Sequence, residues 1–317
     1  MSNPDSVVDI ILRSSDGVQF PVHKSLLSQA SPFFNDMFSI PQPNSSLDSD
    51  APTDLIDLSE PSETIKLILS LCWHADSPHT SLLIDSLSHI ADLLQAADKY
   101  DMGTIRKHAL YSLTQLKFLE NEPLRVYAIA SRYGFHDTAM LAAQHTLRYP
   151  LLHSEYFSEL EMVDGGTIYR VLRYHKQCTA AALKVATDHT WIRDAYVFFD
   201  CPEAISDEGD DNDEDEDEEV SGTCTTTIRT HPSRKHKNGY LKEVSVHPWW
   251  TKFMDTTKVA LSESIYSETI RDKGRVMEAL SSASQCSRCR RLVKSDFSKF
   301  LDAYVNELEA RVNEVSA

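Results

Sequence analysis

The sequence predicts an α+β fold at the N-terminus, with a small β-sheet flanked by helices, and then a mostly helical C-terminal region with a disordered acidic insertion. Three observations support this prediction. Two short apolar runs separated by a turn indicate a hairpin near the start of the chain. Apolar residues at helical spacing dominate most of the remainder. A tract at 207–219 has 11 acidic residues among 13, and so acidic a stretch has nothing to bury.

Length and composition are those of a chain with a real core. It has 317 residues, of which 41% are hydrophobic, and this excludes global disorder. The formal net charge is −17, but the acidic tract carries most of the excess, so the charge gives no general argument for nucleic-acid binding. No apolar stretch approaches the roughly 18–20 residues of a membrane span. We therefore expect a cytoplasmic or nuclear protein whose six cysteines stay reduced unless they bind metal.

The first predicted elements are a hairpin and two short helices. Gly17 supplies the positive φ that a tight hairpin turn often needs. A helix is expected over 23–30, because its apolar residues have a helical rather than a strand period. Pro32 suits the first turn of the next helix, with Ser31 as the cap. The apolar residues of these elements are Ile10, Ile11, Leu12, Leu26, Leu27, Phe33, Phe34, Met37 and Phe38.

A loop, a strand and three helices are expected next. Residues 39–53 are rich in Ser, Pro, Asn and Asp and lack periodicity, so they predict a loop. The apolar residues of 55–58 predict a short strand. Ser59 is expected to cap the following helix, with Pro61 early in its first turn. Further helices are predicted over 82–99 and 104–113.

This order of elements resembles the BTB/POZ domain. The motifs that carry the resemblance are D-[IV]-[IV]-L from Asp9, F-x-V-H-K-x-[LV]-L from Phe20, S-x-x-F-x-x-[ML]-F from Ser31 and A-A-x-x-Y-x-M from Ala96. The resemblance covers residues 5–115. It implies a BTB/POZ fold and a protein-interaction module without catalytic machinery, so we do not expect an enzyme. The chain as a whole also resembles the BTB proteins that are expanded in fungi.

The remaining chain divides into three predicted regions. A helical extension covers 116–200, with a break between two helices at Gly134. A disordered insertion, first acidic and then basic, covers 203–245. A C-terminal helical region covers 246–317, and its last helix is predicted over 295–315. The residues expected on buried helix faces are Val126, Ile129, Ala130, Ile168, Val171, Leu172, His175, Trp249, Trp250, Phe253, Met254, Phe297, Phe300, Leu301, Tyr304, Val305, Leu308 and Val312.

Six residues of the BTB-like segment are candidates for an interaction surface. In BTB proteins the Asp and the basic residue that match Asp9 and His23 lie near a charged pocket on the dimer side. The resemblance therefore implies a role in self-association or partner docking. The alternative is that both residues only satisfy local hydrogen bonds where a strand and a helix begin. The candidate surface consists of Asp9, His23, Lys24, Phe33, Phe34 and Phe38.

Four cysteines are candidates for a metal site. Cys286 and Cys289 form a C-x-x-C, a spacing that lets two thiolates bind one tetrahedral ion. Cys201 and Cys224 flank the acidic tract and would be neighbours if that tract loops out. Together the four predict a structural zinc site, while inert thiols and redox use stay open as alternatives. The C-x-x-C does not follow a thioredoxin-like βαβ pattern, which disfavours redox use.

Three functions are compatible with the resemblance. The first is a scaffold that binds other proteins and forms a homodimer through the BTB domain. The second is a substrate adaptor of a cullin-type ubiquitin ligase, although the hydrophobic-x-Glu motif of such adaptors is missing after Phe38. The third is a transcriptional regulator without direct DNA contact, because the chain lacks zinc-finger spacing. The expected partners are therefore proteins, including a second copy or a cullin, with no membrane and no direct nucleic acid.

Overall fold

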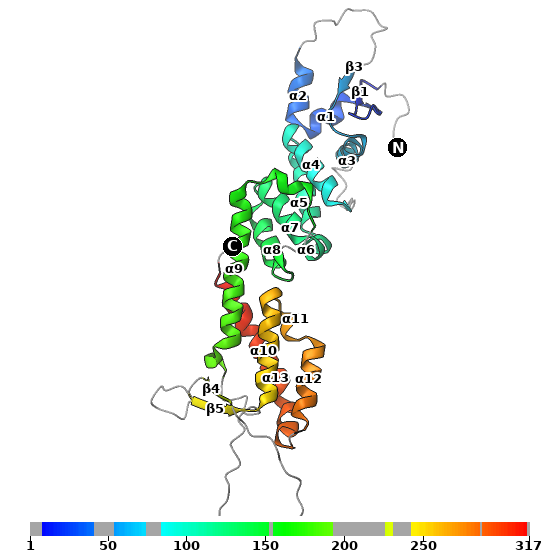
Figure 1. Ribbon diagram of the computed structural model, residues 1–317. Helices are drawn as coiled ribbons and strands as arrows, with labels where there is room; N and C mark the ends of the chain where they lie inside the picture. Colours follow the sequence, from blue (N-terminus) through cyan, green and yellow to red (C-terminus); the bar gives the residue numbers. More distant parts are fainter. Residues whose placement is uncertain are drawn as a thin grey trace, which may run out of the picture. The chain divides into compact units, whose positions relative to one another are not determined.

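The computed structural model describes the chain in several segments that form two compact units (Figure 1). The first unit comprises Met1–Ala142 and Tyr156–Asp164, and the second comprises Ala143–Glu155 and Gly165–Ala317. A small sheet with helices in the first unit and a mostly helical second unit confirm the predicted fold class. The described residues are 8–40, 54–73, 84–151, 155–192, 226–230, 242–285 and 287–315.

A three-stranded sheet opens the first unit. Strands β1 (Ile10–Arg13) and β2 (Gln19–Val22) form the predicted antiparallel hairpin, and Gly17 in its turn has φ of 84°. Strand β3 (Asp54–Asp57) pairs with β1 in parallel, so the strand order is β2-β1-β3. The strand predicted at 55–58 is therefore confirmed, although it begins and ends one residue earlier than expected.

One face of this sheet is buried. Its side chains Ile10, Leu12 and Val22 are at most 2% exposed. Helices α1 (Lys24–Ala30) and α2 (Pro32–Ser39) follow directly and pack on each other. The predicted cap is confirmed, because the Phe34 N–H donates to Ser31 Oγ at 3.1 Å.

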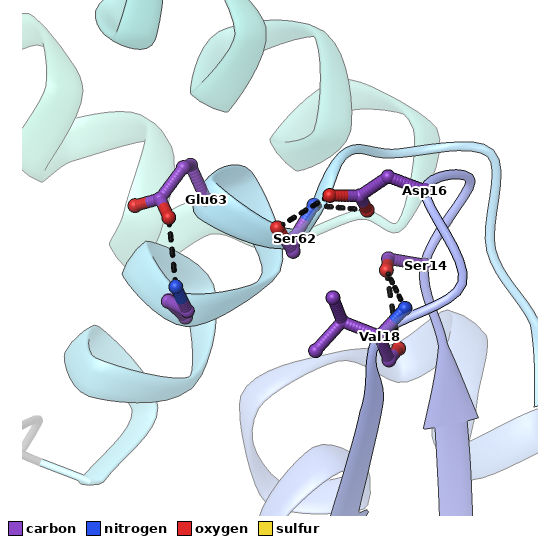
Figure 2. Close-up of polar contacts among 6 residues, drawn as sticks. Ser14, Asp16, Val18, Ser62 and Glu63 are labelled. Atoms are coloured by element: carbon purple, nitrogen blue, oxygen red, sulfur yellow. Dashed lines mark hydrogen bonds and ion pairs between the residues drawn. The ribbon is translucent and has the colours of Figure 1, made fainter.

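Helix α3 (Ser62–Trp73) has a cap that differs from the expected one (Figure 2). The Ser62 N–H donates to Asp16 Oδ1 at 2.9 Å, and the Ser62 hydroxyl donates to Asp16 Oδ2 at 2.6 Å. Asp16 lies in the hairpin turn, 46 residues earlier in the chain. The expected cap, Ser59, instead accepts a hydrogen bond from Lys99 Nζ. The prediction of Ser59 as the cap is wrong because a distant carboxylate reaches the helix start.

Helices complete the first unit. The predicted break at Gly134 is confirmed, with φ of 72° between α7 and α8. A short 3-10 helix, η2, returns to pack on α7, where Arg125 Nη2 lies 2.6 Å from Glu159 Oε1. Helix α6 was not predicted. The elements are α4 (Leu87–Lys99), α5 (Gly103–Leu113), α6 (Leu116–Asn121), α7 (Pro123–Arg132), α8 (His136–Thr146) and η2 (Ser158–Met162).

Long helices and an aromatic core form the second unit. Helix α9 packs on α10 and α13, and α12 packs on both α10 and α13. The ring of Phe300 has the rings of Trp250, Phe253 and Phe297 as neighbours, with centroids at most 6.5 Å apart. All four side chains are buried, which confirms them as core residues. The elements are α9 (Gly165–Thr187), η3 (His189–Trp191), β4 (Thr226–Thr230), β5 (Lys242–Val246), α10 (Pro248–Glu263), α11 (Ser267–Ile270), α12 (Lys273–Ala283) and α13 (Ser287–Asn313).

Three details of the second unit differ from the predictions. Leu172 is 42% exposed, because the buried face of α9 runs through Thr167, Val171 and Tyr174. Helix α13 begins at Ser287 rather than at 295. The antiparallel pair β4 and β5 lies within the predicted insertion at 203–245, where no strand was expected. The acidic tract at 207–219 lies outside the described residues.

Candidate interaction surface

Two carboxylates and two basic residues meet at one end of the sheet, and we call this group the charged edge. Asp9 precedes β1 and Asp54 begins β3; because these strands are parallel, both carboxylates lie at the same end. Strand β2 runs antiparallel and ends there at Val22, so His23 and Lys24 follow at that end too. The topology thus brings Asp9, His23, Lys24 and Asp54 together from three separate segments.

The charged edge is held by direct polar contacts. The Lys24 N–H donates to Asp9 Oδ2 at 3.1 Å, so Asp9 satisfies a free N–H at the start of α1. The Asp9 carboxylate also lies 3.6 Å from His23 Nδ1, and Lys24 Nζ lies 2.9 Å from Asp54 Oδ2. These four side chains are between 32% and 58% exposed. Asp9 therefore has a local structural role, and its carboxylate still reaches solvent.

Three phenylalanines of α2 have different environments. Phe33 is 44% exposed, whereas Phe34 is only 2% exposed and stacks on Tyr100 with ring centroids 5.0 Å apart. Phe38 is half-buried, and Lys24 Nζ lies 5.8 Å from the centroid of its ring. Among the six candidate surface residues, Phe34 is therefore a core residue, and its prediction as part of the surface is wrong.

A buried polar network fixes the ring beneath these phenylalanines. The Tyr100 hydroxyl donates to Glu60 Oε2 at 2.5 Å, and Lys99 Nζ donates to Glu60 Oε1 at 2.8 Å. Burial raises the pKa of Glu60, but the hydrogen bonds from Lys99 and Tyr100 outweigh it and hold that pKa below its usual value. Burial and the same hydrogen bond raise the pKa of Tyr100. Glu60 is therefore a carboxylate at neutral pH, and it anchors α4 to the segment before α3.

Helix α2 also presents an apolar patch to solvent. Ile40, directly after the helix, is 62% exposed, and Phe33 lies seven residues earlier on the same side of the helix. We call Phe33 and Ile40 the α2 patch. The sequence analysis included Phe33 but missed Ile40, because the segment after Ser39 was expected to be loop.

The predicted metal ligands are mostly beyond the described residues. Cys201, Cys224 and Cys286 lie outside them, and Cys289 is 1% exposed near the start of α13. Within the described ranges, no group of three or more His, Cys, Asp or Glu side chains is placed to hold a metal ion. The zinc site therefore stays a prediction.

A cavity of about 340 Å³ in the second unit is lined by charged side chains of both signs. Arg311 Nε donates to Glu307 Oε1 at 2.8 Å, and Asp188 accepts the Thr190 N–H at 3.1 Å. Hydrogen bonds from Thr190 lower the pKa of Asp188. Arg311 and Asp188 thus each have a hydrogen-bond partner within the second unit.

The first unit combines a small three-stranded sheet and helices with charged and apolar side chains that reach solvent. Residues 1–117 match the family model of the BTB/POZ domain. The chain therefore carries a BTB/POZ domain at 1–117, and this domain is a protein–protein interaction module. A comparison with curated proteins finds no match to the chain. Among the helices of the described ranges, none has both the length and the apolarity that crossing a bilayer requires.

Proposed function

We propose that this protein is an interaction scaffold that pairs with a second copy through its BTB/POZ domain. The observation that carries the proposal is the composition of the charged edge. A two-fold interface uses the same surface on both partners, so that surface must contain its own complement. Two carboxylates and two basic side chains, all partly exposed, meet this condition.

Light scattering and sedimentation velocity on the full chain, up to high micromolar concentration, test this proposal. Lys24→Glu gives the charged edge three carboxylates and only one basic side chain, so we expect weaker self-association. Lys66→Glu is the matched control, since Lys66 also pairs with a carboxylate, Glu63, at 2.7 Å and lies on α3. A wild-type chain that stays monomeric at high micromolar concentration would refute the proposal.

A second candidate is an adaptor of a cullin-type ubiquitin ligase, and the α2 patch favours it. Phe33 and Ile40 are exposed apolar side chains that a partner could bury, and buried aromatic anchors commonly dominate binding energy. The missing hydrophobic-x-Glu motif weighs against this candidate. Affinity capture followed by titration of a purified cullin N-terminal domain tests it. Ile40→Asp should abolish such binding, while Leu116→Asp, on the exposed start of α6, should not.

A further inference from the structure

Helix α9 differs in charge from the chain as a whole. Its 23 residues include the basic side chains Arg170, Arg173, Lys176 and Lys184 and no carboxylate. The whole chain, by contrast, has 48 acidic residues and a net charge of −17. Surface helices are commonly stabilised by pairs of opposite charges three or four positions apart. Helix α9 has no such pair within itself, so its positive charges are available to groups outside the helix.

Two of these basic residues share a solvent-facing stripe with apolar side chains. One face of α9 packs on α10 and α13. Positions 169, 172, 173 and 176 follow the helical spacing of three, four and seven and lie on the opposite face. Tyr169 is 65% exposed and Leu172 is 42% exposed, and both basic side chains are exposed as well. We call Tyr169, Leu172, Arg173 and Lys176 the outer α9 stripe.

The two positive charges of the stripe have no fixed partner. Within the described part of the chain, the side chains of Arg173 and Lys176 form neither an ion pair nor a hydrogen bond. Other basic residues of the second unit differ in this respect. Lys252 Nζ lies 2.6 Å from Glu278 Oε1, and Lys299 Nζ lies 3.1 Å from Asp296 Oδ1. A ligand with carboxylates would therefore find two unneutralised cations on α9.

We infer that the outer α9 stripe binds an acidic amphipathic helix of a partner protein. The carboxylates of such a helix would pair with Arg173 and Lys176, and its apolar side chains would cover Tyr169 and Leu172. Side chains at this spacing form a ridge that another helix can pack against. The inference does not depend on pairing through the BTB/POZ domain, because α9 belongs to the second unit.

The chemistry of the stripe favours a protein segment over a nucleic acid or a membrane surface. The stripe spans seven residue steps, which is about 10 Å of helix, and it offers only two cations. Nucleic acids bind through many phosphate contacts, and an extended anionic surface is repelled by a chain whose net charge is −17. A short helix with a few carboxylates and leucines matches both the size and the mixed character of the stripe.

Fluorescence anisotropy on the full chain tests the inference. The probe is a fluorescein-labelled synthetic peptide of about 16 residues whose glutamates and leucines lie on one helix face. Arg173→Glu with Lys176→Glu should raise its dissociation constant at least about tenfold, because like charges then face each other. Leu172→Gln, which keeps helix propensity, should raise it about threefold or more. Increasing the ionic strength from about 0.05 to about 0.5 M should also weaken binding.

The matched control reverses two charges elsewhere in the second unit. Lys252→Glu with Lys299→Glu gives the same change in net charge, so it should leave binding of the peptide within about twofold of the wild type. The control peptide has glutamine in place of each glutamate and should not bind detectably. Circular dichroism of each variant confirms that the helices are retained.

Four outcomes would overturn the inference. Equal binding by the wild type and the Arg173→Glu, Lys176→Glu variant would place the peptide elsewhere. Polyglutamate that binds as tightly as the amphipathic peptide would show that charge alone is recognised. Binding only after deletion of 207–219 would assign the stripe to the chain's own acidic tract. Binding of phosphatidylserine vesicles but not of the peptide would assign it to a membrane surface.

Sedimentation velocity of the same variants separates this inference from the proposed function. Arg173→Glu with Lys176→Glu should leave self-association unchanged, because α9 lies outside the BTB/POZ domain. A wild-type chain that is monomeric but binds the peptide would refute the proposed pairing and support the inference. A chain that self-associates but does not bind the peptide would do the reverse.

Discussion

Replacing Tyr100 by Phe isolates the hydrogen bond that fixes the aromatic cluster beneath α2. The phenylalanine ring can keep the stacking on Phe34, so only the hydroxyl that donates to Glu60 at 2.5 Å is lost. Tyr100 is 4% exposed, and the Glu60 side chain is 10% exposed. Water therefore cannot easily replace the lost donor.

The magnitude follows from the charge of the acceptor. A hydrogen bond to a charged group contributes about 1.5–3 kcal/mol to stability. Since Lys99 still binds Glu60 in the variant, the lower part of that range applies, about 1.5–2 kcal/mol. For a unit of this size the melting midpoint should fall by about 3–8 °C.

The variant should also become more sensitive to acid. The folded-state pKa of Glu60 is lowered, so its stabilising effect is present above the unfolded-state pKa and is lost as the pH falls through the folded-state pKa. Without the tyrosine hydroxyl that pKa rises, and the loss should begin at a higher pH than in the wild type.

Urea unfolding followed by circular dichroism, at pH 7 and pH 5, measures both effects. Hydrogen exchange of peptides from 84–113 assigns the transition to the first unit. Tyr111→Phe is the matched control, because Tyr111 is 55% exposed in the same unit. If Tyr100→Phe is no less stable than Tyr111→Phe, the reasoning about the buried hydroxyl is wrong.

Three further predictions concern the cap, the buried ion pair and the metal. Asp16→Asn should lower the melting midpoint at pH 7, and the difference from wild type should vanish as the pH approaches the Asp16 pKa of about 2, which hydrogen bonds from Ser14 and Ser62 depress. Glu159→Gln should cost about 1.5–3 kcal/mol of unfolding free energy, because it removes the buried carboxylate beside Arg125 while Glu122 still contacts that guanidinium. Glu122→Gln, which removes the more exposed carboxylate beside Arg125, should cost clearly less; equal losses would contradict this. Elemental analysis should find one zinc per chain, reduced in Cys286→Ser and Cys289→Ser, and an absence of zinc in the purified wild type would reject the site.

Much of the first unit could be predicted from the sequence, because its signals are local. Gly17 and Gly134 both have the positive φ that their turns require, and Ser31 caps the helix that it directly precedes. The short apolar run of Ile10, Ile11 and Leu12 likewise predicts a strand of the hairpin. Each of these features depends on residues within a few positions of one another.

The features that the sequence did not predict depend on contacts between distant segments, or on which face of a helix is buried. The cap of α3 comes from Asp16, and the partner of Tyr100 is Glu60, 40 residues earlier. On α9 the buried face was predicted to include Leu172, but the buried residues are Val171, Tyr174 and Cys178. The strands β4 and β5 lie in a region whose composition predicts disorder, and only their pairing reveals them.

The interaction surface belongs to this second kind of feature. Asp9, His23 and Lys24 could be proposed from their position near the hairpin, but Asp54 joins them only because β3 pairs in parallel with β1. The same pairing brings Leu55 beside Ile11, and Asp57 beside Arg13. A shift of that register by one residue would turn Leu55 toward the core and Asp54 outward. The charged edge therefore depends on this strand alignment, and a variant that disturbs it should weaken the contact between Lys24 and Asp54.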